Sequence, residues 1–189
     1  MSYRNQRSPE TEAYLRNYRH ILERMIAGMT QARLGDSISA NFIVQMIPHH
    51  RAAIEMSENL LKSSCFTPLV QIAQNIICTQ EQSIAQMERI LRGCSRKTNC
   101  PDAVCRYQDQ MDCILQTMFD EMKNARTGDC INVDFMREMI PHHEGAVRMA
   151  KTTLKYDICE ALVPILDAII REQEEGIRKM ERLLRECER

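Results

Sequence analysis

One segment of the sequence occurs twice, and this repetition constrains the fold more than any other feature. The first copy covers residues 41–56 and the second covers residues 134–149. Both contain Met-Ile-Pro-His-His with a further Met six residues after the second His. The copies lie 93 residues apart, and Gly35-Asp36 matches Gly128-Asp129 at the same offset. Because no insertion or deletion separates the halves, the sequence predicts an internal duplication with pseudo-twofold symmetry.

Helical spacing of apolar residues runs through most of each half. The segments are rich in Leu, Ile, Glu, Arg, Gln and Met, and Gly and Pro number only six each, which favours helices over strands. The two motif helices and their partners are expected to form a central four-helix bundle. We therefore predict an all-α protein, an antiparallel bundle of two three-helix repeats, with helices at residues 10–32, 40–62, 68–93, 102–126, 132–156 and 160–187.

The expected organisation is one helical domain over residues 10–189, preceded by a disordered N-terminus at residues 1–9. Repeat one covers residues 10–93 and repeat two covers residues 103–187, and a polar linker at 94–102 joins them. A chain of 189 residues is long enough to bury the core of one such domain.

Composition excludes several classes of partner. The formal net charge is -1, so nothing suggests binding to nucleic acid or to an anionic membrane surface.

No apolar run approaches the ~20 residues that span a bilayer, and the first residues lack the apolar stretch of a secretory signal, which predicts a cytoplasmic protein. The odd number of Cys, nine, fits free thiols in a reducing compartment. A homo-oligomer is compatible with the sequence.

Ten of the thirteen Met residues occupy matching positions in the two halves, whereas only one pair of Cys does. Exchanging Met for Leu in a core costs less than about 1.5 kcal/mol, so Met kept only for packing should have diverged. Their retention suggests that the sulfur is used, although a Met stripe at helical spacing is also ordinary core filling. The five matched pairs are Met25 with Met118, Met29 with Met122, Met46 with Met139, Met56 with Met149 and Met87 with Met180.

Helical geometry places the Met and His residues of each half near one another. Met46 and His50 are four residues apart and lie on one face of a helix, and His49 and Met56 share a neighbouring line. Pairs of Met on the preceding helix and a Met on the following helix can approach the same point. Soft thioethers select Cu(I), and imidazole also suits copper, including Cu(II). The sequence therefore predicts copper sites in two equivalent places, the second formed by Met139, His142, His143 and Met149.

A proline precedes each His pair, at Pro48 and Pro141. A proline inside a helix removes one backbone hydrogen bond and bends the helix. Each proline therefore indicates either a bend beside the His residues or the start of a new helical segment.

Two alternatives to a non-catalytic copper protein remain. The first is a metal-dependent oxidoreductase of the ferritin-like type, which uses Glu-x-x-His pairs. Glu138 instead precedes His142 by four residues, no Ser-His-Asp or Cys-His pairing is legible, and we do not expect an enzyme. The second is a structural helical module that binds no metal.

The motif resembles the domain of unknown function 305 family. The resemblance rests on Phe-x3-Met-Ile-Pro-His-His-x2-Ala-x2-Met, followed by a Gln-x6-Met helix, and it extends from about residue 20 onward. It implies a ferritin-like four-helix bundle associated with copper binding and copper resistance. The ligand candidates that it implies are Met46, His49, His50, Met56, Met87, Met139, His142, His143, Met149 and Met180.

Overall fold

The computed structural model describes residues 7–188, and within them the chain forms helices and no strands. The predicted disordered segment falls mostly on residues 1–6, which lie outside the described residues. A short 3-10 helix, η1 (Glu160–Leu162), precedes the last α-helix. The α-helices are α1 (Pro9–Thr30), α2 (Ile38–Leu61), α3 (Thr67–Cys94), α4 (Pro101–Lys123), α5 (Ile131–Thr153) and α6 (Val163–Cys187).

Local sequence explains where several helices begin. Ser8 caps α1 by accepting a hydrogen bond from the Thr11 backbone N–H at 3.1 Å, and Pro9 follows it. Such a cap supplies an acceptor for a backbone N–H that has no partner within the helix. Ser37 caps α2 in the same way, accepting from Ala40. Every helix end lies within three residues of its predicted position.

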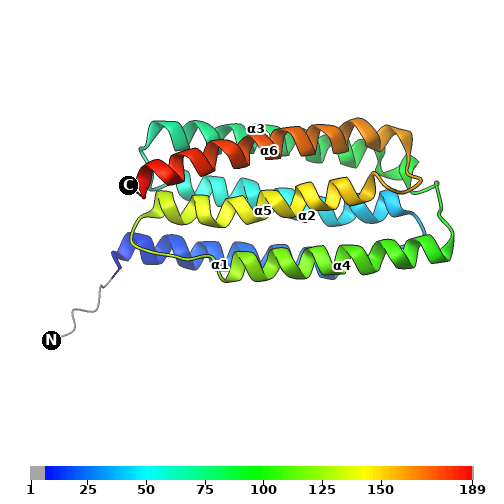
Figure 1. Ribbon diagram of the computed structural model, residues 1–189, viewed down its shortest axis with the longest axis horizontal. Coiled ribbons are helices and arrows are strands. Elements are labelled where there is room, and N and C mark those ends of the chain that lie inside the picture. Colours follow the sequence, from blue (N-terminus) through cyan, green and yellow to red (C-terminus); the bar gives the residue numbers. More distant parts are fainter. Residues whose placement is uncertain (1–6, 189) are drawn as a thin grey trace.

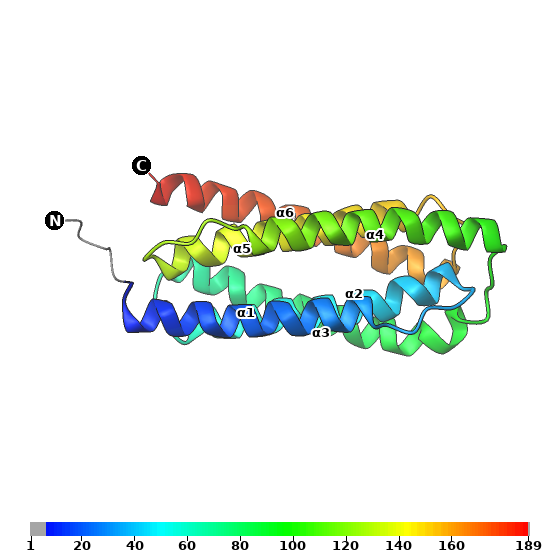
Figure 2. The same cartoon turned by 90° about the horizontal axis from the view of Figure 1, so that it is seen from below.

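Three pairs of helices stack on one another, as Figure 1 shows. The α2/α5 pair lies in the middle, with α3/α6 on one side and α1/α4 on the other, and consecutive helices run antiparallel (Figures 1 and 2). The α2, α3, α5 and α6 helices contact one another in a closed ring, α2 with α3, α3 with α6, α6 with α5 and α5 with α2. This arrangement places both copies of the repeated motif in the centre of the molecule.

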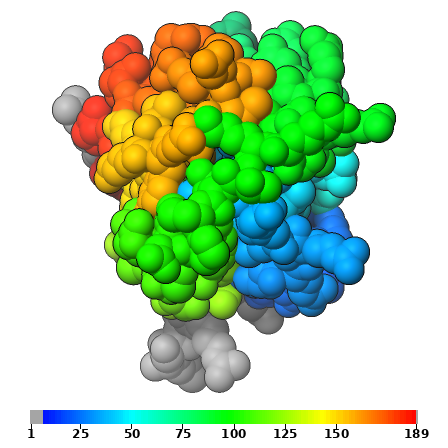
Figure 3. Space-filling model, turned by 90° about the vertical axis from the view of Figure 1, so that its right-hand side faces the viewer, coloured from blue at the N-terminus to red at the C-terminus, as the bar shows by residue number. Residues whose placement is uncertain are grey.

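The connection from α3 to α4 crosses one end of the bundle, where Figure 3 shows it in green. Its Asn99 backbone N–H donates to the Asp36 carbonyl at 2.8 Å, and its side chain accepts from Ile38 N–H at 3.0 Å. The same side chain donates to the Asp157 carbonyl at 2.7 Å. Asn99 thus ties the loops of both halves together at this end.

Both motif prolines lie inside continuous helices, Pro48 in α2 and Pro141 in α5. Neither proline begins a new helical segment. Gly28 of α1 packs against the first of them, since a Cβ on Gly28 would lie 2.8 Å from the Pro48 Cβ. The absent side chain of Gly28 therefore lets α1 approach α2 beside the motif.

No helix in residues 7–188 is both long enough and apolar enough to cross a membrane. All nine Cys fall within these residues and are present as free thiols. Cys94 is buried, Cys159 is half-buried and the others are exposed.

Replacing Gly145 with Ala is expected to destabilise the protein by about 1–3 kcal/mol, the usual range for overpacking. A Cβ at Gly145 would lie 2.1 Å from the Met118 Sδ and 2.7 Å from its Cγ. Either the Met118 side chain or the whole of α4 must therefore shift. Urea unfolding measures the change. Gly93→Ala is the matched control, because Gly93 is exposed in α3 and no described atom lies within 4 Å of an added Cβ. Helix propensity predicts that this exchange raises the free energy of unfolding by up to about 1 kcal/mol. Equal effects at both glycines would contradict the close packing of α4 on α5.

Candidate metal-binding site

The two motif helices meet through their first His residues. The imidazole rings of His49 and His142 stack with their centroids 3.7 Å apart and their planes at 29°. Each ring nitrogen Nε2 lies 3.2 Å from the backbone carbonyl oxygen of the other His. The contact is reciprocal, and it lies in the core, since both side chains are fully buried.

The second His of each motif flanks this stacked pair. His50 lies beside His49, and His143 lies beside His142, with centroid separations of 5.9 Å in both cases. The four imidazoles are therefore neighbours in the order His50, His49, His142, His143, and we call this set the His row. The sequence had suggested two separate places, because periodicity along a helix does not show how α2 and α5 cross.

Hydrogen bonding sets the tautomer of the stacked pair. A carbonyl oxygen can only accept, so the Nε2 of His49 and the Nε2 of His142 each carry the proton and donate it. Their Nδ1 atoms must then hold lone pairs. All four motif imidazoles have a buried Nδ1 without a hydrogen-bond partner among the described residues. A buried polar atom left unpaired costs about 1–3 kcal/mol, so four such atoms in one row require an explanation.

Burial keeps these imidazoles neutral. Desolvation lowers the pKa of His50 to about 3 and that of His142 to about 4. Desolvation likewise lowers the pKa of His49 and His143 well below the ordinary value. Neutral imidazole is the form that binds a metal ion, so the lone pairs are available at neutral pH.

The two flanking His residues have different neighbours. The Nε2 of His50 lies 3.1 Å from the Ser83 hydroxyl of α3. At the equivalent position of α6 the residue is Gly176, where an added Cβ would lie 3.0 Å from the His143 Cδ2 and 3.2 Å from its Nε2. His143 therefore lacks the hydroxyl partner that His50 has. The sequence contained a signal for this difference, since Ser83 and Gly176 are offset by 93 residues.

The predicted Met residues all lie in the core. Each is at most 2% exposed. The sulfur of Met118 packs against the motif helix α5 at Gly145, two residues after His143. The ten buried Met residues are Met25, Met29, Met46, Met56, Met87, Met118, Met122, Met139, Met149 and Met180. Within residues 7–188, no group of three or more His, Cys, Asp or Glu side chains is arranged to hold a metal ion.

A buried carboxyl group lies on α5 one turn before the His pair. Glu138 is fully buried, and its Oε2 accepts a hydrogen bond from the Tyr14 hydroxyl at 2.7 Å. Desolvation raises the pKa of Glu138 well above its ordinary value. Gln45 occupies the equivalent position on α2 and donates to the Met29 carbonyl at 3.4 Å. The contact with Tyr14 could not be read from the sequence, because it joins residues 124 positions apart.

Two buried glutamines accompany the His row. Gln80 and Gln173 are 4% and 2% exposed, and the Oε1 atom of each has no hydrogen-bond partner in the described part of the chain. The adjacent Glu174 instead forms an ion pair with Lys151 at 2.7 Å on the surface. The glutamines thus face inward, while this glutamate belongs to the solvated edge of α6.

Fold and site together define a class of all-helical proteins that enclose His and Met side chains between central helices. The chain belongs to the DUF305 family, a domain of unknown function, whose model matches residues 39–184. It is similar to the solved structure of CopM in its silver-bound form, obtained by soaking. That likeness has 28% sequence identity and a TM-score of 0.58, and it covers 78% of this chain and 95% of CopM. No curated protein matches the chain.

Proposed function

We propose that this protein binds copper as cargo and sequesters it or passes it on, without catalysing a reaction. The observation that carries the proposal is the row of four neutral, buried imidazoles whose Nδ1 atoms have no hydrogen-bond partner among the described residues. A metal ion would satisfy these atoms. The silver-bound state of CopM supports a soft ion, since Ag(I) and Cu(I) prefer the same ligands.

The donor set favours copper over harder metal ions. The core that encloses the His row also contains the ten buried Met residues, and thioether sulfur and imidazole nitrogen suit Cu(I). Zn²⁺ more often takes thiolate, imidazole and carboxylate ligands. Seven of the nine Cys are exposed on the surface, so they do not supply thiolates to the core. In this proposal the matched Met residues hold the ion together with the motif His residues. Which of the Met and His residues bind the ion depends on how the stacked rings of His49 and His142 rearrange when it binds.

We also propose how the fold arose. We infer that the chain is a duplicated three-helix unit that forms a ferritin-like bundle, which fits helices offset by 93 residues and the reciprocal contacts of His49 and His142. The alternative function is that of a ferritin-like oxidoreductase. Iron retained through purification, together with oxygen consumption, would favour that alternative.

Titration of the apoprotein with Cu(I) against a chromophoric chelator tests the proposal. We expect binding tighter than micromolar, and we expect the double variant His49→Ala with His142→Ala to weaken it strongly. Circular dichroism checks that this variant is still helical. His20→Ala is the matched control, because the His20 side chain is 70% exposed and distant from the motif helices in sequence. Absent binding, or binding unchanged in the double variant, would reject the proposal.

Replacing Met46 and Met139 with Leu separates the role of sulfur from the role of packing. Leu fills a similar volume, so each exchange should cost less than about 1.5 kcal/mol of stability. If the sulfurs are ligands, Cu(I) affinity should nevertheless fall by about tenfold or more, since hydrocarbon cannot coordinate the ion. Met111→Leu is the matched control, because Met111 is equally buried and has no Met at the equivalent position. Unchanged affinity in the double variant would assign these Met residues to packing alone.

A further inference from the structure

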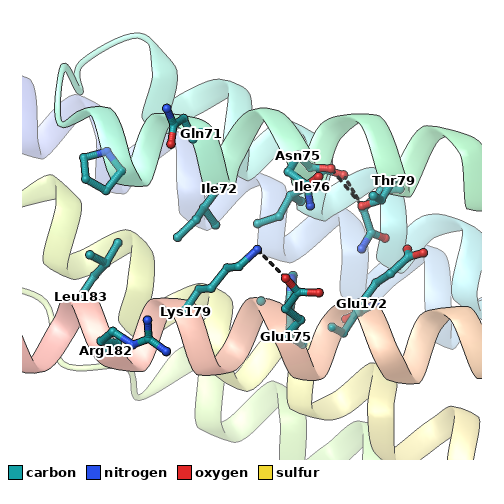
Figure 4. A pocket seen from close by; sticks show the side chains of 15 residues that line it. Gln71, Ile72, Asn75, Ile76, Thr79, Glu172, Glu175, Lys179, Arg182 and Leu183 are labelled. Carbon is teal, nitrogen blue, oxygen red and sulfur yellow. Dashed lines mark hydrogen bonds and ion pairs between the residues drawn. The ribbon is translucent and has the colours of Figure 1, made fainter.

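The structure contains two equivalent grooves between α3 and α6, one toward each end of this helix pair. Each has a volume of about 440 Å³. Their linings correspond at the 93-residue offset: Ile72, Ile76 and Leu183 line the first, and Ile165, Ile169 and Ile90 line the second. Figure 4 shows the first groove, in which Ile72 and Ile76 of α3 face Lys179 and Leu183 of α6.

Only one of the grooves includes a motif His in its lining. His143 lines the first groove together with Gly176 and the two buried glutamines. His50 is not among the described residues that line the second groove, where Ser83 takes the place of Gly176. The side chain of His143 is 2% exposed, whereas that of His50 is fully buried. A glycine on α6 therefore leaves one end of the His row open to a groove, and a serine on α3 closes the other.

We propose that copper reaches and leaves the buried His row through the α3–α6 groove that contains His143, and that the equivalent route to His50 is closed by Ser83. This inference rests on the proposed copper-binding function and adds the path of exchange. His143 is the first imidazole that the ion meets, and its neighbours in the row accept the ion afterwards. The hydroxyl of Ser83 both fills the space beside His50 and occupies its Nε2 at 3.1 Å.

Charged residues surround the open groove. Lys179 and Glu175 form an ion pair of 2.6 Å across one turn of α6, and Glu172 lies one turn further (Figure 4). Arg182 also lines the groove, so Lys179 and Arg182 balance the carboxylates of Glu172 and Glu175 and the lining carries no net charge. The apolar walls and the glutamines offer a cation no strong ligand before His143. This combination suits a passage better than a storage site.

Chemical modification tests the geometry without any metal. Diethyl pyrocarbonate acylates accessible imidazoles, and peptide mass spectrometry reports each His separately. His20 is the exposed reference. Among the four core His residues, His143 should react first and His50 about tenfold or more slowly, because a sealed group reacts only through local opening. Gly176→Ser should suppress the reaction of His143, and Ser83→Gly should accelerate that of His50. Equal reactivity of His50 and His143 in the unaltered protein would overturn the proposed route.

Loading kinetics test the same route with the ion itself. Transfer of Cu(I) from a chromophoric chelator is followed by absorbance in the unaltered protein, Gly176→Ser and Ser83→Gly. We expect Gly176→Ser to slow loading by about tenfold or more with little change in equilibrium affinity, and Ser83→Gly to accelerate it. Circular dichroism confirms folding of each variant. Tight binding with identical rates in all three proteins would overturn the route but keep the copper function, whereas no binding in any of them would overturn both.

Discussion

Acidification from about pH 7.5 to about pH 5.5 is expected to lower the free energy of unfolding by roughly 3 kcal/mol through His50 and His142 alone. Burial lowers the pKa of these residues from 6.5 to about 3 and about 4. Below pH 6.5 the unfolded chain binds protons at both residues and the folded chain does not. Stability is therefore present above the ordinary pKa and is lost as the pH falls through it. The pKa of His49 and of His143 is lowered for the same reason, so both add to the loss.

Urea unfolding at a series of pH values measures this dependence. Near pH 5 the slope should reach about 1.4 kcal/mol per pH unit for each buried His. His50→Gln removes one titrating group and should reduce the slope by that amount, whereas the exposed His20→Gln should leave it unchanged. A slope that His50→Gln does not alter would show that His50 binds its proton equally well in the folded and unfolded chain.

The positions of the helices could be predicted because apolar residues repeat at helical spacing and because glycines and prolines mark the ends. Ser37 shows the limit of that reasoning. Asp36, Ser37 and Ser39 are all polar residues that could cap α2, yet Ser37 holds that place and also donates to the Cys94 carbonyl at 2.9 Å. The choice among three neighbouring polar residues depends on this contact with α3, which local sequence does not encode.

The candidate site could likewise be predicted from the sequence only in part. The sequence indicated that His49, His50, His142 and His143 would point inward, because all four share helical faces with apolar residues. It did not indicate that His49 stacks on His142, since that contact requires the crossing of α2 over α5. Nor did it indicate the roles of Ser83 and Gly176, because the rotation of α3 and α6 about their axes decides which residue faces each His.

Glu138 is a buried carboxyl group, and the equivalent residue in the first half of the chain is Gln45. Glu138→Gln is expected to stabilise the protein at neutral pH. Because burial raises the pKa of Glu138 well above 4.5, its stability contribution is present below that value and is lost as the pH rises through the raised pKa. The loss amounts to about 1.4 kcal/mol for every pH unit between the two values.

The geometry of the fold favours this exchange. An amide oxygen at position 138 can still accept from the Tyr14 hydroxyl, which lies 2.7 Å from the present Oε2. Since Gln45 donates to the Met29 carbonyl, we expect the new amide N–H to donate to the equivalent Met122 carbonyl, which accepts from Tyr18 at 3.1 Å. The carboxyl oxygen Oε1, by contrast, has no partner among the described residues.

Thermal unfolding near pH 8 and near pH 4.5 measures the effect and its sign. Glu138→Gln should raise the midpoint at the higher pH and change it little at the lower pH, where the carboxyl group is protonated in the folded chain. The reverse exchange, Gln45→Glu, should lower the midpoint at pH 8, because Gln45 is 2% exposed and a carboxylate there would be equally desolvated. Glu186→Gln, on the exposed face of α6, is the matched control and should have little effect at either pH. If Glu138→Gln lowers the midpoint at pH 8, then the charged carboxylate is stabilised in the folded core, and the desolvation of Glu138 does not govern its contribution.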